Sequence, residues 1–354
     1  MKILDRYLAG AVIGGTLLTL AVLLPLMGFF LLADQMDEVG ENGYRFADAV
    51  LFVALTLPRY AYQAFPIATL IGALVGLGSL ASHSELVAMR AAGLSIGRIV
   101  YGALKGGALL ALVAAAVGEG VAPAAEQKAL QWRSEAESGQ VTLKTEYGFW
   151  ARDGSSYINI LDILSGAHLR DIYIYELDDK LRLRRATRAE NARYRKGGWV
   201  LEGISSSSIS EDRVEVDHQD RARWSSLLNP RLLKIVVVEP QVLAVWDLFR
   251  YLRYMMANNQ DARPYEVAFW GKVIHPLLIL AMIFVSIPIL LGSTRTSGLG
   301  PRIFLGILVG ILFYLISRTF SYFALLYNMS PLVATLIPPV LFLGAALWVL
   351  RRVG

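Results

Sequence analysis

Arginine is the residue type whose positions in this 354-residue chain most strongly suggest chemistry, and that chemistry is phosphate binding. Arg318 lies inside an apolar stretch, whereas Arg59 and Arg133 lie at the outer ends of two others. A guanidinium group binds phosphate through two parallel hydrogen bonds, so three of them at one level could bind a phosphorylated lipid head group. Contact with ordinary head groups, or ion pairing with Glu119 or Glu126, is the alternative interpretation.

The side chains near these arginines are aromatic and aliphatic. Tyr314 and Tyr322 flank Arg318 four residues away on either side, and Phe65 and Leu70 lie within the second apolar stretch. We expect these four residues to line an apolar cavity for acyl chains, with the arginines at its rim. An arginine in the middle of a transmembrane helix costs about 2.5–3.5 kcal/mol, so Arg318 must face a cavity, a partner or head groups.

The motifs of covalent catalysis and nucleotide binding all fail in this chain. The segment Gly93-Leu94-Ser95-Ile96-Gly97 matches a nucleophile elbow only as letters, because it follows a predicted helix and the nearest histidine, His83, lies upstream. The Gly271-Lys272 pair lacks the earlier glycine of a phosphate-binding loop, since Glu266 occupies that position. The chain has no cysteine, and its four histidines show no metal-binding spacing. We therefore predict no enzyme, no metal site and no cofactor; a partner must supply the energy for any work.

The elements that must position these residues are six apolar stretches and one polar insertion. The stretches lie at 8–33, 60–81, 99–122, 273–292, 303–325 and 332–350 and are close to the length of a membrane-spanning helix. Between the third and the fourth, residues 141–238 alternate apolar and polar, with Asp153-Gly154 and Gly197-Gly198 where hairpins would turn. About eight to ten short strands of this kind suggest a sandwich or jellyroll.

The predicted fold is an α+β membrane protein, with six transmembrane helices and a periplasmic β-jellyroll domain inserted between helices 3 and 4. Residues 1–123 contain the first three helices, with a short cytoplasmic helix at about 84–92, and residues 124–240 form the β domain. Residues 241–263 form an amphipathic helix at the outer interface, and residues 264–354 the last three helices. Glycine pairs four residues apart are typical of ordinary helix packing: Gly72 and Gly76, Gly102 and Gly106, Gly306 and Gly310.

The distribution of charge predicts the orientation. With both termini in the cytoplasm, the inner segments carry the basic residues Lys2, Arg6, Arg90, Arg98, Arg295, Arg302, Arg351 and Arg352. The short outer segment from Asp34 to Asp48 is instead mostly acidic. The net charge of +5 therefore reflects membrane orientation rather than nucleic-acid binding.

The loop between the second and third stretches is a candidate docking site for the partner that supplies energy. Residues 84–92 read as a short helix that ends at Gly93 and presents Leu86, Met89 and Arg90 on one side, with Glu85 at its start. Such a helix on the cytoplasmic face fits a groove in a motor protein. A solvated connector is the alternative.

Several short segments, in order, resemble one known family. They are Leu4-Asp5-Arg6-Tyr7, Ala33-Asp34-Gln35, Phe65-Pro66, Leu74-Val75-Gly76-Leu77-Gly78, Ser84-Glu85-Leu86-Val87, Ala91-Ala92-Gly93, Gly118-Glu119, Ala122-Pro123, Glu126 and Trp150-Ala151-Arg152-Asp153-Gly154. With the six-span plan around a β domain, they resemble the LptF/LptG family of lipopolysaccharide export permeases along almost the whole chain. Both subunit types share this plan, so the resemblance leaves an LptF-type subunit as the alternative to an LptG-type one.

The resemblance implies a subunit in the bacterial inner membrane that pairs with an LptF-like permease above a dimer of the ATPase LptB, which binds the ATP. The pair would extract lipopolysaccharide from the outer leaflet and pass it along the β-jellyroll toward LptC and an LptA-type bridge. Glu85 to Arg90 would form the coupling helix, and Arg59 and Arg133 would face the lipid phosphates. Leu31, Asp37 and Glu38 stand where some relatives carry lysines. A membrane-anchored scaffold without transport activity is the remaining alternative.

Overall fold

The computed structural model describes residues 3–40, 43–138, 142–153, 156–164, 168–178, 180, 182–195, 198–210, 213–224, 240–258, 260–292, 298–327 and 329–353. Of the residues used in the sequence predictions, Lys2, Gly154, Gly197 and Arg295 lie outside this set.

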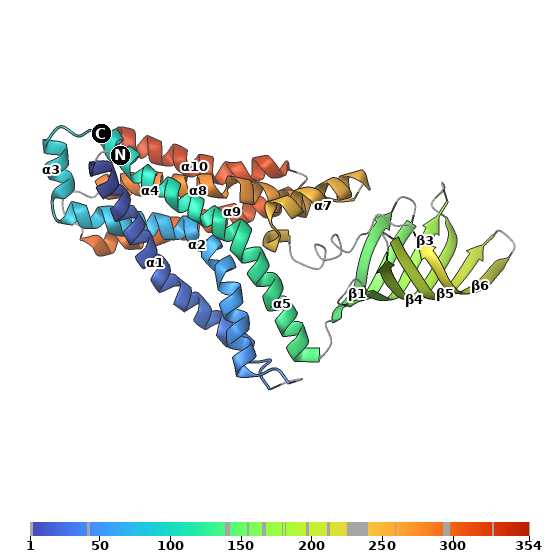
Figure 1. The fold of residues 1–354 in the computed structure, drawn as a ribbon. Coiled ribbons are helices and arrows are strands. Elements are labelled where there is room, and N and C mark those ends of the chain that lie inside the picture. Colours follow the sequence, from blue (N-terminus) through green and yellow to red (C-terminus); the bar gives the residue numbers. More distant parts are fainter. Residues whose placement is uncertain are drawn as a thin grey trace.

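Six long apolar helices form the body of the protein, as predicted. The helical elements are α1 (Ile3–Gln35), α2 (Phe46–Ser82), α3 (Glu85–Ala91), α4 (Ile96–Ala116), the π-helix η1 (Val117–Val121), α5 (Ala122–Ser138), the short η2 (Pro240–Val242), α7 (Val245–Ala257), α8 (Arg263–Gly292), α9 (Leu299–Leu326) and α10 (Pro331–Val353). The third span continues through η1 into α5, so residues 124–138 extend the bundle as a helix. Both termini and α3 lie at one end, called here the inner end, and the β-sheet lies beyond the opposite, outer end (Figure 1).

Glycines allow the helices to approach closely, which confirms the packing role predicted for the three glycine pairs. A Cβ atom on Gly76 would lie 2.0 Å from the carbonyl oxygen of Ala11, so α1 and α2 touch backbone to backbone. Gly106 contacts Ala9 of α1 in the same way, and Gly306 packs against Leu74 of α2. Any larger side chain at these positions would force the helices apart.

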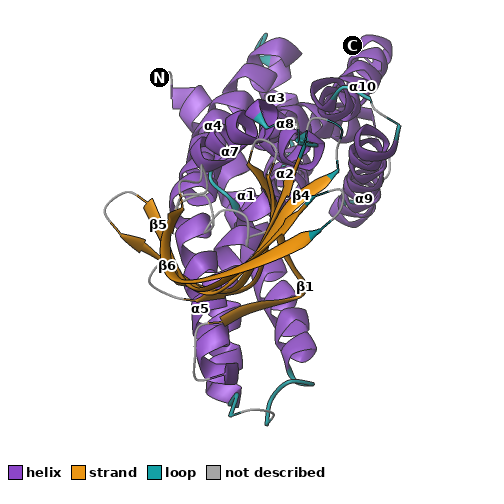
Figure 2. Cartoon of the chain, turned by 90° about the vertical axis from the view of Figure 1, so that its right-hand side faces the viewer, coloured by secondary structure: helices purple, strands orange, loops and turns teal. Residues whose placement is uncertain are grey.

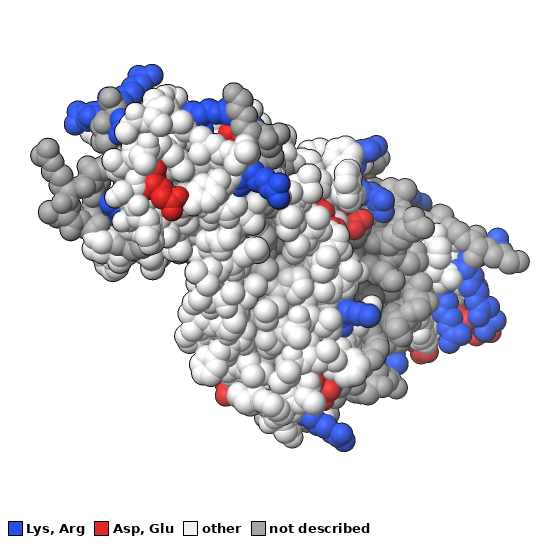
Figure 3. Space-filling view, turned by 60° about the vertical axis from the view of Figure 1, so that its left-hand side comes forward, with Lys and Arg blue, Asp and Glu red and all other residues white. Residues whose placement is uncertain are grey.

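The helices differ greatly in how much of their apolar surface the protein itself covers. In the most apolar 18-residue window, 67% of the residues of α2 and 61% of those of α8 are buried, but only 11% in α1 and 17% in α9. α2 and α8 therefore form the centre of the bundle, and α1 and α9 its periphery. The space-filling view shows a broad surface without charged side chains, which is the surface a bilayer or a partner would cover (Figure 3).

The β domain is a single antiparallel sheet in which the described strands pair in chain order. The strands are β1 (Thr142–Asp153), β2 (Ser156–Leu164), β3 (His168–Leu177), β4 (Leu183–Arg195), β5 (Gly198–Ile209) and β6 (Val214–Trp224). The described residues thus form six strands of 9–13 residues, instead of the eight to ten shorter ones expected. The sheet is strongly curved (Figure 2). Two of the hairpins turn where the sequence predicted, between Asp153 and Ser156 and between Arg195 and Gly198.

One face of the sheet is apolar toward the bundle and becomes polar farther away. Its buried core includes Ile158, Ile172, Leu201 and Trp199, and Tyr254 of α7 packs against it. Farther along β5, the same face carries polar side chains such as Ser208, which lies four residues beyond the buried Ile204 and so points the same way.

Candidate functional site

Arg59 is partly buried and forms an ion pair with the buried Glu126, which joins α2 to α5. The Arg59 Nη1 and Glu126 Oε1 atoms are 3.2 Å apart, and the two side chains are only 18% and 6% exposed. The guanidinium group also donates a hydrogen bond to the Tyr60 hydroxyl over 3.1 Å. The sequence placed Arg59 at the mouth of its span, but α2 begins at Phe46, so Arg59 lies well inside the helix. Of the two interpretations, ion pairing with Glu126 is therefore the one observed.

Arg133, at the outer part of α5, forms an ion pair with Glu38 just beyond the end of α1. Arg133 Nη2 lies 2.5 Å from Glu38 Oε1, and the side chains are 30% and 39% exposed. The guanidinium group also lies 5.5 Å from the centre of the Phe52 ring on α2. This pair was missed, because helices brought together across 95 residues of sequence leave no local signal. It joins the outer end of α1 to α5 by charge.

Arg59 and Arg133 lie at different heights along α2, whereas the sequence placed them at a similar depth. Arg133 sits over Phe52, which precedes Arg59 by seven residues on α2, so the two sites are about 10 Å apart along the helix axis. Arg318 lies on exposed α9, with its guanidinium carbon 5.8 Å from the Tyr322 ring. Tyr314 and Tyr322 are 52% and 53% exposed. Arg318 and its tyrosines therefore belong to the outward surface of α9.

Phe65 and Leu70 are packed inside the bundle rather than lining an open surface. Phe65 belongs to the core that α1, α2, α4 and α8 share. Leu70 is fully buried in a second core, with Phe313 of α9 and Phe342 of α10. In this conformation both residues hold helices together, so they could reach a lipid only after the helices had moved.

The short helix α3 forms as predicted, but a different side of it faces outward. Leu86 is buried and Met89 packs against the same core, so these two residues fix α3 to the bundle. Val87, which the prediction omitted, is 65% exposed and forms the outward face with Arg90. A seven-residue helix is not stable alone and needs such an apolar anchor. Ser84 precedes the helix at a φ of 61°, and Gly93 follows it at a φ of 89°.

Glu85 is held by the first helix. Tyr7 of α1 donates a hydrogen bond from its hydroxyl group to Glu85 Oε2 over 2.7 Å. Two residues before Tyr7, the buried Asp5 forms ion pairs with Arg98 at 2.7 Å and Lys105 at 2.6 Å, both on α4. The start of α1 is thus joined both to α3 and to α4, so these elements move together.

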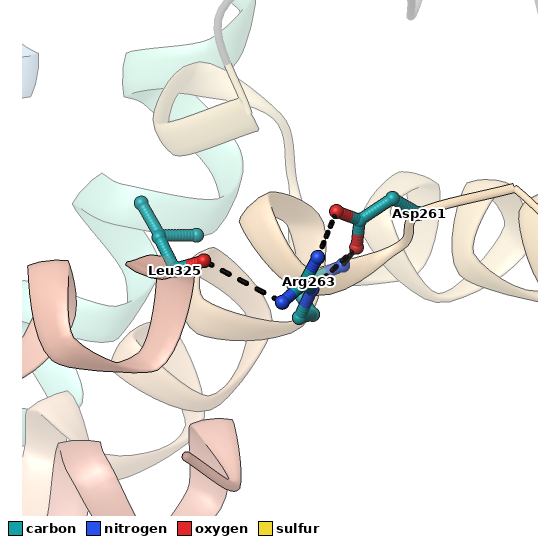
Figure 4. A network of polar contacts seen from close by, with 3 residues as sticks. All are labelled: Asp261, Arg263 and Leu325. Carbon is teal, nitrogen blue, oxygen red and sulfur yellow. Dashed lines mark hydrogen bonds and ion pairs between the residues drawn. The ribbon is translucent and has the colours of Figure 1, made fainter. Parts of the chain in front are cut away.

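A third polar contact closes the outer end of the bundle near the start of α8. Arg263 Nη2 lies 2.6 Å from Asp261 Oδ2, and Arg263 Nη1 donates to the carbonyl oxygen of Leu325, near the end of α9, over 3.5 Å (Figure 4). A cation is favourable there, because the last carbonyl groups of a helix carry partial negative charge. The hydrogen bond from Arg263 lowers the pKa of Asp261 below its ordinary value.

The elbow-like string begins a helix and does not form the strand–turn–helix of a nucleophile elbow. Ser95, the serine of the elbow-like string, begins α4 and accepts a hydrogen bond from the backbone N–H of Arg98, which is an N-cap. The described part of the chain contains no cluster of three or more His, Asp or Glu residues able to hold a metal ion. What the geometry offers instead is arginine–carboxylate pairs between helices and a short helix at the inner end.

In the described part of the chain, six apolar helices and a β-sheet between the third and fourth spans define a multi-span membrane protein with a β domain outside the spans. The sequence profile of the family described as "Lipopolysaccharide export system permease LptF/LptG" matches residues 6–352, so the chain belongs to this family. It is 31% identical over 353 residues to the lipopolysaccharide export system permease protein LptG of Escherichia coli K12, covering 99% of this chain and 98% of that protein. The LptG protein of Haemophilus influenzae is 32% identical over 351 residues, with the same coverage.

Proposed function

We propose that this chain is an LptG-type permease subunit that extracts lipopolysaccharide from the outer leaflet of the inner membrane and passes it to its β domain. The names of its relatives support the substrate class. The observation that carries the mechanism is the Arg133–Glu38 ion pair, because it closes the outer end of the weakly covered helix α1 onto α5. A lipid phosphate can replace the carboxylate on this arginine and so release α1.

The second subunit, an LptF-like permease, docks on α1 and α9. These helices expose long apolar rows, including Val22 and Phe29 on α1 and Phe304 and Leu308 on α9. The space between the two permeases forms the lipid cavity, with acyl chains against the apolar rows. Arg133, Arg59 and Arg318 supply positive charge at different heights along its wall.

The ATPase, an LptB-type dimer, docks at α3. Val87 and Arg90 point outward at the inner end, beside a groove of about 740 Å³ that Arg6 and Tyr7 help to line. Because Tyr7 binds Glu85, a movement of α3 is passed to α1. Closure of the ATPase dimer would shift α1 and narrow the cavity, which is rigid-body switching between two packings.

The lipid then moves along the apolar face of the sheet toward LptC and an LptA-type bridge. That face is packed in this conformation, with Ile158 and Ile172 fully buried, so the sheet must open to accept acyl chains. The interior is apolar where the lipid enters and polar farther along, which favours its release at the far end.

Reconstitution tests this proposal. The chain is placed in vesicles with lipopolysaccharide, an LptF-like permease and an LptB-type ATPase, and lipid transfer to an LptA-type acceptor is measured after ATP is added. We expect transfer only from the complete complex, and loss of transfer with Glu85→Arg. If Glu85→Arg transfers normally, the scaffold function is favoured; transfer by this chain alone with ATP would refute the proposal.

A further inference from the structure

Glu119, in the π-helix η1, joins three helices that meet near the outer end of the bundle. Its Oε1 atom lies 3.0 Å from Lys272 Nζ on α8, and its Oε2 atom accepts a hydrogen bond from the backbone N–H of Val245, at the start of α7, over 2.6 Å. The Lys272 side chain is only 7% exposed. A carboxylate at the start of a helix binds an N–H group that has no partner within the helix and lies at the positive end of its dipole.

The local sequence explains why the helix widens at Glu119. Pro123 has no N–H group, so it cannot donate to the carbonyl oxygen of Gly118, its partner in a π-turn. Lys272 Nζ donates to that oxygen instead, over 3.3 Å. Gly118 itself lies against the Tyr62 ring of α2, where an added Cβ atom would come within 2.3 Å of a ring carbon. Glycine, proline and lysine at these positions therefore form one unit that holds Glu119 in place.

The contacts of Glu119 matter because they involve the helices that come before and after the β domain along the chain. α5 is the helix that leads from the bundle toward β1, and among the described elements α7 is the first long helix after the sheet. Both legs of the β domain are therefore bound to the same carboxylate, and Lys272 joins that carboxylate to the central helix α8. His275, one turn further along α8, stacks on Tyr62 at 4.0 Å and contacts the Tyr62 carbonyl oxygen, which adds α2 to the junction.

We infer that Glu119 is a positioning residue that makes both legs of the β domain follow α8, so that closure of the bundle moves the sheet as a unit. This inference rests on the proposed function only for the source of the movement. Without the Glu119 contacts, the start of α7 would lose its polar link to η1, and η1 would keep only the Lys272–Gly118 hydrogen bond and apolar packing to α8, so the sheet would follow the bundle less closely.

The test measures a distance and a coupling ratio in the complete complex. The chain has no cysteine, so Lys180→Cys in the turn between β3 and β4 and Leu341→Cys on α10 give two unique spin-label sites in it. Electron–electron resonance then compares nucleotide-free and vanadate-trapped complexes. We expect a narrow distance distribution that shifts with nucleotide in the parent chain. In Glu119→Ala we expect a broad distribution without a shift, and at least about fivefold less lipid transferred per ATP hydrolysed.

Two further variants separate the contacts and guard against misfolding. Glu119→Gln keeps an oxygen that can accept from Val245 and should retain the narrow distribution, whereas Lys272→Met should broaden it. Glu266→Gln removes another acid from the same end of α8 and is the matched control, with parental values expected. The inference would be overturned if Glu119→Ala and Lys272→Met both showed the distances and the coupling ratio of the parent chain. It would also be overturned if the distance in the parent chain did not change with nucleotide. If the parent moves no lipopolysaccharide but its distance still shifts with nucleotide, only the proposed function fails.

Discussion

Replacing Glu38 by glutamine should strengthen lipopolysaccharide binding, because the lipid phosphate and the Glu38 carboxylate compete for Arg133. Glutamine keeps the size of the side chain but removes its charge. The lipid no longer has to displace a carboxylate that lies 2.5 Å from the guanidinium group. If Glu38 did not bind Arg133, its carboxylate would only repel the lipid phosphate weakly, through charge at a distance.

The size of the effect follows from the exposure of the pair. With the side chains 30% and 39% exposed, the ion pair belongs to the partly exposed class, worth about 0.5–1 kcal/mol. Removal of this competition should lower the dissociation constant about 2–5-fold. Burial of the lipid phosphate contributes equally to binding by the parent chain and by Glu38→Gln, so it does not change the ratio of their dissociation constants.

The assay is equilibrium binding of fluorescent lipopolysaccharide to the permease–ATPase complex in nanodiscs, at constant salt. Asp37→Asn is the matched control, because it removes the same charge one residue away and should change binding much less. In the background Arg133→Gln, the change at Glu38 should no longer strengthen binding. Weaker binding by Glu38→Gln, or equal gains from the two single variants, would show that Arg133 does not bind the lipid phosphate.

Three further changes test other parts of the structure. Val87→Asp should leave the melting temperature of the chain nearly unchanged, since Val87 is exposed, but reduce copurification of the ATPase at least about tenfold. Arg59→Met leaves the buried carboxylate of Glu126 without its arginine and should cost about 3–5 kcal/mol of stability in thermal unfolding, most of it recovered by adding Glu126→Gln. The lowered pKa of Asp261 means that its contact with Arg263 stabilises the fold above the unfolded pKa of about 3.9 and is lost as the pH falls through the lower folded value. The protection factors of the amides at the α7–α8 turn, measured by hydrogen exchange, should therefore stay constant from pH 8 to about pH 5, and Asp261→Asn should match the parent only in acid.

Each of these three changes has its own comparison variant. Val87→Ala should keep the ATPase, because it adds no charge to the docking face. A Glu126→Gln variant that is as unstable as Arg59→Met would show that lost packing, not the isolated charge, dominates at that site. If Asp261→Asn shows parental exchange at neutral pH, the contact at the turn contributes nothing measurable.

The sequence predicts the elements of this protein better than it predicts their contacts. Hydropathy identifies the spans, since crossing a bilayer requires about 20 apolar residues. It does not predict that α2 already begins at Phe46, well before the apolar stretch at 60–81. Glycine marks the end of α3 because its positive φ is a local property. The inward direction of Leu86 could not be predicted, since a seven-residue helix has apolar residues on more than one side. The partner of Arg59 depends on how two distant helices are rotated about their axes.

The uneven contacts of α1 also determine how its sequence can vary. Leu8, Val12 and Thr16 are fully buried against neighbouring helices, whereas the buried positions of α1 end at Leu20. Beyond that point, α1 packs against the bundle on one side only, through partly buried residues such as Leu23 and Met27, and lipid or another subunit would cover the rest. Acyl chains accept almost any apolar shape. Random mutagenesis under selection for growth should thus find few tolerated changes in the first half of α1 and many in the second. The boundary between the two would locate, within a single helix, where full burial by this chain ends.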